Sequence, residues 1–382
     1  MIYLDNASTA FPKAPGVAEA VAASIRELPG SAGRASHGYA IAASEKLYDV
    51  RLALGRFFGM RDPERLVFTR NATEALNLAI LGTVRPGDRV VASPFEHNAV
   101  MRPLRELERR DGVVVEAFPC SSGGTPDLDA LAAMLDAGPC GLLVLCAAGN
   151  VSGAVLPLPG LISLAHDRGV PVLVDGSQLA GHRRVDFERL GADYFAFSGH
   201  KGLLGPAGTG GLCLAAGSAP RPLFFGGTGS ASASELQPDF LPDRYEAGTH
   251  NLAALSGLRV AVEFLEAAGI EAVEAREREL RGRLARGFAA LDGLRIVGCD
   301  REEEAVPVLS VLPWPGLPSM TDIAAELDAR GIAVRMGLQC APAAHRQIGT
   351  FASGGTLRFS PGYFTTEADI DEALGAMEEI LS

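Results

Sequence analysis

Lysine is rare in this 382-residue chain, and its rarity makes one lysine stand out. Only three of the 34 Lys and Arg residues are lysines, and Lys201 is the one that directly follows an apolar run, residues 194–197. An arginine side chain is always charged, whereas a lysine amine can act as a nucleophile towards an aldehyde. A surface lysine in a turn is the alternative, but the placement of Lys201 favours amine chemistry.

Polar side chains also follow four other short apolar runs. These are Asn71 and Thr73 after residues 66–68, His97 after residues 90–93, Asn150 after residues 142–148, and Asp175 and Gln178 at and after the end of residues 172–174. A buried Asp needs a partner, and a cationic ring nitrogen is one. Hydroxyls and the free amides at a helix start bind phosphate. Singly, Thr73 and His97 are explained as helix caps; with Lys201, the set fits pyridoxal phosphate.

The elements that must position these residues alternate along the chain. Continuous apolar runs at residues 66–68, 90–92, 113–115, 142–145, 172–174, 194–197 and 212–214 alternate with helical patterns at residues 73–81, 98–110, 128–135 and 158–166. Runs without polar alternation are typical of strands buried on both faces. The order predicts an α/β protein with a mostly parallel sheet between helices, and ligands bind at the carboxyl ends of such strands.

The second half of the chain has a different pattern. A glycine- and serine-rich segment, residues 217–251, predicts a long loop, and residues 252–291 read as one long helical stretch. Strands are predicted at residues 306–311, 332–334 and 357–359, and a closing helix at residues 367–380. We therefore expect a large domain at residues 16–254. A smaller α+β domain is expected at residues 255–382, joined by residues 1–15.

Composition excludes several classes of protein. The formal net charge of −12 argues against a nucleic-acid partner and an anionic membrane surface. No signal peptide is evident, and no apolar run reaches the ~20 residues of a membrane helix. The six cysteines form no disulfide framework, and CxxC and HExxH metal motifs are absent from the sequence. A cytoplasmic, soluble protein without a metal is expected.

An ordered set of motifs resembles the class V aminotransferase-fold enzymes, and within them the cysteine desulfurase and selenocysteine lyase branch. The motifs are Asp5-Asn6-Ala7, Asn71-Ala72-Thr73-Glu74-Ala75, Glu96-His97-Asn98, Asp175-Gly176-Ser177-Gln178, Ser198-Gly199-His200-Lys201, Tyr245-Glu246-Ala247-Gly248-Thr249 and Arg335-Met336-Gly337-Leu338-Gln339-Cys340-Ala341-Pro342. Each is weak alone, but the order from residue 3 to about residue 365 is specific. The resemblance implies fold type I of the pyridoxal 5'-phosphate enzymes: a large domain with a mostly parallel seven-stranded sheet between helices, and a smaller C-terminal α+β domain.

The resemblance also implies a role for each matching residue. The implied catalytic residues are Lys201, which binds the cofactor aldehyde and moves protons, Cys340, which receives sulfur as a persulfide, and His97. For the cofactor, the implied contacts are His97 on the ring, Asp175 on its nitrogen, Gln178 on its phenolic oxygen, and Ala72, Thr73, Ser198, His200 and, across a homodimer, Thr249 on its phosphate. Asn150, which also borders the cofactor, Arg358 and Arg335 are implied to bind the substrate.

The implied activity is cysteine desulfurase, which converts L-cysteine to L-alanine and leaves a persulfide on Cys340 for an acceptor such as another protein. Selenocysteine lyase, with L-selenocysteine as substrate, or another class V enzyme that does not use Cys340, is the alternative. A non-catalytic scaffold is disfavoured because Lys201 and Asp175 are both present. Gln339 stands where many relatives have His, which removes a proton-transfer group beside Cys340 and bears on the rate and the acceptor.

Overall fold

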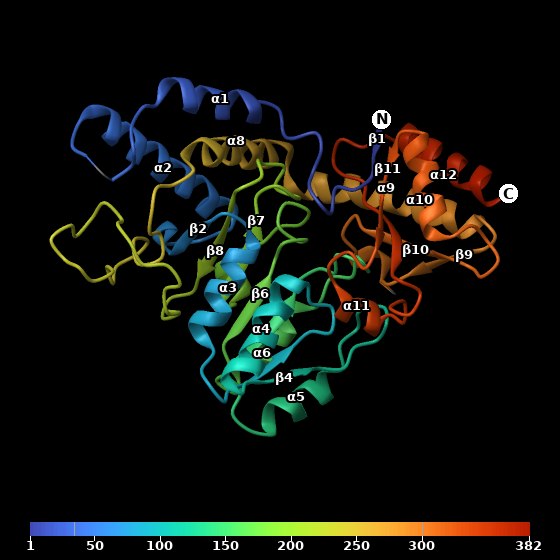
Figure 1. Cartoon of the computed structure of the whole chain (residues 1–382), viewed down its shortest axis with the longest axis horizontal. Coiled ribbons are helices and arrows are strands. Elements are labelled where there is room, and N and C mark those ends of the chain that lie inside the picture. The colour runs from blue at the N-terminus through green and yellow to red at the C-terminus, as the bar shows by residue number, and fades with distance from the viewer. Residues whose placement is uncertain (34, 300) are drawn as a thin grey trace.

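A seven-stranded sheet lies at the centre of the structure, a computed structural model that describes residues 1–33, 35–299 and 301–382 (Figure 1). In spatial order its strands are β2 (Leu66–Thr69), β8 (Gly210–Leu214), β7 (Tyr194–Ser198), β6 (Val172–Asp175), β5 (Leu142–Cys146), β3 (Arg89–Ala92) and β4 (Val114–Ala117). Only β8 within this sheet is antiparallel to its neighbours, so the other six strands run in one direction. The predicted mostly parallel sheet of seven strands is confirmed.

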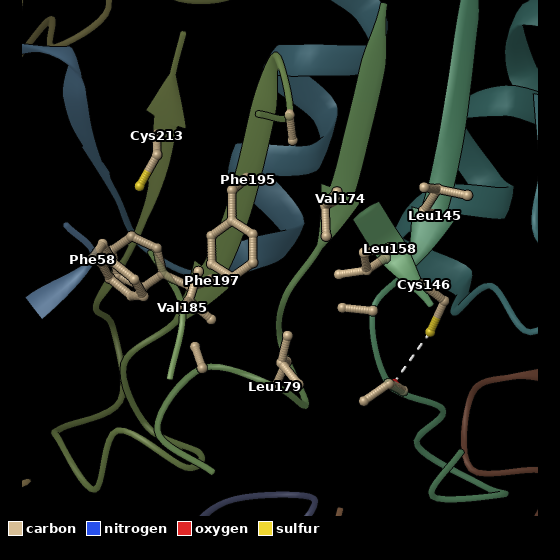
Figure 2. Packing of buried hydrophobic residues seen from close by; sticks show 14 of the residues in the cluster. Phe58, Leu145, Cys146, Leu158, Val174, Leu179, Val185, Phe195, Phe197 and Cys213 are labelled. Atoms are coloured by element: carbon tan, nitrogen blue, oxygen red, sulfur yellow. Dashed lines mark hydrogen bonds between the residues drawn. The ribbon is translucent and has the colours of Figure 1, made fainter. Parts of the chain in front are cut away.

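Helices cover both faces of this sheet. On one face lie α3 (Ala72–Thr83) and α4 (Asn98–Asp111); on the other lie α2 (Gly38–Phe57), α5 (Leu128–Asp136), α6 (Leu158–His166) and α8 (Leu252–Ala268), with α1 (Val17–Glu27) on α8. Each strand contributes side chains to the apolar clusters on both faces of the sheet, because successive side chains along a strand point to opposite faces. Val174 packs with Phe58 and Phe195 in one cluster (Figure 2), whereas Leu173 packs with Leu76 in the other.

A second, four-stranded sheet stands beside the first, at the orange and red end of the chain in Figure 1. Its antiparallel strands are, in spatial order, β12 (Arg335–Gly337), β13 (Thr356–Phe359), β10 (Leu309–Pro313) and β9 (Leu294–Val297). The helices α9 (Ile270–Ala290), α10 (Met320–Ala329) and α12 (Glu367–Leu381) share its core. The chain start joins this part, since β1 (Ile2–Tyr3) pairs in parallel with β11 (Ile332–Ala333).

The remaining helices are short. They are α7 (Phe187–Leu190), α11 (Pro342–Gln347) and the 3₁₀ turns Pro63–Arg65 and Glu302–Glu304. Residues 217–251 contain no helix or strand, as predicted for the long loop. None of the helices in the described ranges is both long and apolar enough to cross a membrane.

Three predicted elements differ in detail from the structure. The single helix expected at residues 252–291 is two helices, because Gly269 takes a φ of +80° between α8 and α9. The strand expected at residues 306–311 begins three residues later, since β10 starts at Leu309. Val306 is buried, but its amide bonds to the Gly153 carbonyl at 2.9 Å instead of a neighbouring strand. The segment expected as one strand at residues 332–334 contributes to β11, and β12 follows it at Arg335.

The division into residues 16–254 and residues 255–382 with residues 1–15 stays a prediction. The apolar side chains of α8 pack with the cluster of the large sheet, whereas Leu280 and Leu284 of α9 pack with the second sheet. This packing favours a boundary nearer Gly269 than residue 254.

Candidate active site

One cavity of about 280 Å³ lies at the carboxyl ends of the parallel strands, where the second sheet and the first residues of the chain meet them. It is lined by Ala72, Thr73, His97, Asn150, Asp175, Gln178, Ser198, His200, Lys201, Arg335, Cys340 and Arg358, which are all of the predicted site residues except Thr249. Ala7, Ser8, Cys146, Ser177 and Gln339 also border it. The parallel strand order explains the convergence, since the loops after β2, β3, β5, β6 and β7 all leave the same sheet edge.

An amine and a carboxylate from neighbouring strands border this cavity. Burial lowers the pKa of Lys201 below its ordinary value, so more of the side chain is the neutral amine that attacks carbonyl groups. Nζ has no hydrogen-bond partner among the described residues. Asp175 ends β6, and its Oδ1 accepts hydrogen bonds from the Ser177 amide at 3.0 Å and hydroxyl at 2.5 Å. These bonds orient the carboxylate and leave Oδ2 for a ligand.

The start of α3 presents backbone amides to the same cavity. Asn71 caps the helix by accepting from the Glu74 amide at 3.0 Å, and the Ala72 amide donates to Ser198 Oγ at 3.0 Å. The Thr73 amide has no partner within the described part of the chain. A helix start with a free amide, next to the Ser198 hydroxyl and the His200 ring, suits an anion such as a phosphate.

His97 and Glu96 follow β3 and differ in exposure. His97 caps α4, with Nδ1 accepting from the Ala99 amide at 3.0 Å. Burial lowers the pKa of His97 to about 4, so the ring is neutral and carries its hydrogen on Nε2. Glu96 is fully buried, and burial raises its pKa to about 8. Its Oε1 accepts from the Ser93 hydroxyl at 2.7 Å, while Oε2 is buried without a partner among the described residues.

Arg358 on β13 closes the cavity from the second sheet. Its side chain is buried, with Nη1 donating to the Asn150 carbonyl at 3.0 Å and Nη2 donating to Asp5 Oδ1 at 2.6 Å and Ser8 Oγ at 2.8 Å. Arg335 Nη1 donates to the same Ser8 hydroxyl at 3.2 Å. No local sequence pattern indicates the roles of Asp5 and Ser8, because the arginines that they contact lie more than 320 positions away. The Asp5-Asn6-Ala7 motif contributed to the family resemblance but did not indicate that Asp5 binds an arginine.

Cys340 lies in the loop between β12 and α11 and is the one exposed thiol among the six cysteines. Its carbonyl accepts from the Asn98 amide at 2.8 Å, which ties the loop to the start of α4. Cys146 also borders the cavity, but it is buried at the end of β5 and donates to the Ala148 carbonyl at 3.2 Å (Figure 2). Burial raises the pKa of Cys146 well above its ordinary value, which disfavours the reactive thiolate.

Thr249 lies apart from the other predicted residues, in a separate hollow that it shares with Phe68, Arg70 and the glycines of the long loop. The turn that carries it is anchored by a buried ion pair, Arg51 Nη2 to Glu246 Oε2 at 2.7 Å. His250 Nε2 also lies 2.7 Å from Glu246 Oε2. Within one chain, therefore, Thr249 is not part of the cavity that contains Lys201.

Comparison with known proteins places this geometry in a family. The family model for aminotransferase class-V matches residues 2–373. A probable cysteine desulfurase of Xylella fastidiosa is 32% identical, covering 100% of this chain and 91% of its own length. The apo structure of a cysteine desulfurase from Thermococcus onnurineus is 30% identical with a TM-score of 0.91, covering 100% of this chain and 94% of that one. A cysteine desulfurase structure from Escherichia coli (S-sulfonic acid) is 29% identical with a TM-score of 0.88, covering 100% and 94%. The chain belongs to the class-V aminotransferase family.

Proposed function

We propose that this enzyme is a cysteine desulfurase that uses pyridoxal 5'-phosphate to move sulfur from L-cysteine to Cys340. The observation that carries the proposal is that one cavity brings together the Lys201 amine, the Asp175 carboxylate and the exposed Cys340 thiol. The names of the similar proteins support the same activity.

The residues of the cavity fit the cofactor. Gln178 Oε1 is buried without a partner among the described residues, although its Nε2 donates to the Ala7 carbonyl at 2.8 Å. The Thr73 amide and Asp175 Oδ2 likewise have no hydrogen-bond partner among the described residues. A group with a phosphate, a ring nitrogen and a phenolic oxygen would give these atoms partners.

In this enzyme Lys201 would hold the cofactor and then move protons. Bound pyridoxal phosphate supplies an electron sink that makes the Cα proton of an amino acid acidic. Asp175 would keep the ring nitrogen protonated, and the neutral His97 ring would contact the cofactor without adding charge. Arg358 would bind the substrate carboxylate, and Lys201 would take the proton from Cα and return one to the product.

Cys340 would carry out the sulfur transfer. Its thiolate attacks the substrate sulfur, an S–S bond forms and the substrate C–S bond breaks. The electron pair of that bond stays with the carbon fragment, which takes up protons and leaves as alanine. Cysteine and the Cys340 thiol thus give alanine and a Cys340 persulfide, with atoms and electrons balanced and no added oxidant. An acceptor, which could be a thiol of another protein, then takes the outer sulfur.

We further propose that the enzyme is a homodimer in which each subunit contributes a residue to the active site of the other. Thr249 borders a hollow outside the cavity of its own chain, so a phosphate contact from Thr249 requires a second copy. Phe224, Phe225 and Phe240 of the same long loop are exposed, which is typical of a surface that another subunit covers. Thr249 of the partner subunit would then complete the phosphate site.

Mass spectrometry of the intact protein tests the activity. The protein reconstituted with pyridoxal phosphate is incubated with L-cysteine, and we expect a gain of one sulfur atom on Cys340 together with release of alanine. Cys340→Ser should keep the cofactor and lose the adduct, whereas Cys299→Ser, a change outside the cavity, should keep it. L-Selenocysteine is run in parallel. Wild-type turnover of cysteine by Cys340→Ser would assign the chain to another class V activity.

A further inference from the structure

Gln339, the residue before Cys340, directs its side chain into a buried polar cluster. Its side chain is almost completely buried, and Nε2 donates to the Thr356 carbonyl on β13 at 2.7 Å. Its Oε1 lies 2.8 Å from His345 Nε2 on α11. One side chain thus joins the loop that carries Cys340 to the strand and the helix on either side of it.

The direction of each hydrogen bond in this cluster is fixed by chemistry. The Thr356 carbonyl can only accept, so the Gln339 amide nitrogen faces it and Oε1 faces His345. His345 therefore donates from Nε2. Burial lowers the pKa of His345 to about 4, so its ring is neutral and Nδ1 accepts from the Thr350 hydroxyl at 2.7 Å. The cluster is a directed chain of three bonds, Thr350 to His345 to Gln339 to Thr356.

The backbone at Gln339 and Cys340, next to this cluster, is held in an unfavourable conformation. Gln339 and Cys340 have φ values of +39° and +58°, and only two other non-glycine residues in the described ranges have positive φ. Such conformations are unfavourable for residues with a side chain and persist where the surroundings impose them. The Gln339 carbonyl accepts from Asn150 Nδ2 at 2.8 Å, and the Cys340 carbonyl accepts from the Asn98 amide at 2.8 Å. The side chain of Gln339 adds three more hydrogen bonds at the same turn, the third being from the Thr356 hydroxyl to Oε1 at 3.4 Å.

We propose that Gln339 is a positioning residue that, through His345 and Thr356, holds the loop so that Cys340 Sγ points at the substrate sulfur. The inference rests on the proposed function, because it assumes that Cys340 receives the sulfur. Gln339 does not titrate, and its side-chain hydrogen bonds are to Thr356 and His345 and not to the thiol. It acts on the geometry of the attack and not on proton transfer.

Steady-state kinetics of the reconstituted enzyme tests the proposal. Gln339→Leu keeps a similar volume and removes every side-chain hydrogen bond of Gln339. We expect kcat for alanine formation to fall about 10- to 100-fold, the size of effect that small misplacements of reacting groups produce. KM for cysteine should be unchanged, because the carboxylate contacts are elsewhere. Alkylation of Cys340 by iodoacetamide, measured without substrate, should keep its wild-type rate, since the thiol is already exposed.

A second variant breaks the same bond from the other side. His345→Phe should also lower kcat, and the double variant should lose little more than Gln339→Leu alone, since the leucine already removes the bond between residue 339 and His345. His345→Gln can still donate an N–H to Gln339 and should recover much of the rate. Gln347→Leu is the matched control: it lies on the same helix, bonds to the Cys120 carbonyl and should retain wild-type kinetics.

The outcomes separate this inference from the activity itself. If Cys340→Ser is inactive and Gln339→Leu keeps the wild-type kcat, the positioning role is overturned and the proposed function stands. A parallel fall in the alkylation rate and kcat also overturns it, because Gln339 would then act on the thiol's reactivity. If Cys340→Ser desulfurates cysteine at the wild-type rate, the proposed function fails. Additive losses in the double variant overturn the shared bond between Gln339 and His345.

Discussion

Arg358 Nη2 lies 2.6 Å from Asp5 Oδ1, and this ion pair joins residues 353 positions apart at the wall of the active-site cavity. Burial lowers the pKa of Arg358 below its ordinary value, and the Asp5 carboxylate opposes that effect. The guanidinium is therefore oriented before any substrate arrives, with Nε still lacking a partner among the described residues. An anion that enters the cavity meets a fixed cation.

Arg358→Lys should raise KM for cysteine about tenfold or more, because hydrogen bonds to charged groups contribute about 1.5–3 kcal/mol and an ammonium cannot reproduce the planar fork. The change in kcat should be smaller. Steady-state measurement of alanine release checks this. Asp5→Asn keeps the guanidinium, so its effect on KM should be weaker. An unchanged KM in Arg358→Lys would remove Arg358 from the substrate site.

Lys201→Ala should abolish turnover and the visible absorbance of covalently held cofactor while leaving the fold intact. The physical reason is that no other lysine amine lines the cavity. Absorbance spectra and far-UV circular dichroism after reconstitution make the test. Lys46→Ala, on α2 and away from the cavity, should behave as wild type. Residual turnover in Lys201→Ala would contradict the assignment of the amine.

Hybrid dimers of Lys201→Ala and Thr249→Ala chains should be more active than either parent. If Thr249 acts across the interface, one site of each hybrid contains both native residues. Activity after controlled mixing, with sedimentation to establish the dimer, checks this. No recovery on mixing would mean that Thr249 acts within its own chain, and a monomer at working concentration would end the proposal.

Glu96→Gln should raise stability more at pH 8 than at pH 5. Burial raises the pKa of Glu96 to about 8, so the folded state retains a proton that the unfolded chain releases near its ordinary pKa. The contribution of this carboxyl group is fully present below the unfolded pKa and is lost as pH rises towards 8. We expect the stability gap between variant and wild type to widen by at least about 1.4 kcal/mol, which is one pKa unit. Denaturant unfolding at the two pH values measures it, and equal gaps would contradict the shift.

The sequence was sufficient to predict the strands of the large sheet because their burial on both faces makes each an uninterrupted apolar run. Lys201 could be singled out because the chain otherwise uses arginine. An apolar run, however, indicates that its residues are buried but not that they pair with a neighbouring strand. Val306 and Val308 are buried beside β10 without belonging to it, so the predicted strand began too early. The break at Gly269 was missed because a glycine within a helical pattern can also be tolerated.

The contacts that orient the site residues could not be predicted from the sequence, for a different reason. Asp5, Ser8 and Arg358 meet only after two sheets and the chain start have come together, and no local pattern encodes such a contact. Gln339 departs from the family pattern, and the sequence alone shows that departure. Its bond to His345 depends on a turn with positive φ that propensities do not predict.

The first eight residues of this chain form part of the cavity wall and contact strands that come much later in the sequence. During biosynthesis the cavity can therefore form only after those strands have been made. Asn6 Nδ2 donates to the Ser360 carbonyl at 2.9 Å, and Ile2 pairs with Ile332, so the wall formed by the start of the chain needs the last strands. On a ribosome the large sheet and Lys201 emerge well before β13, and long-range pairings of this kind form late. A nascent chain therefore carries the amine without the arginine and thiol that complete the site. The proposed site is therefore complete only after β13 has been synthesised and paired with β10 and β12.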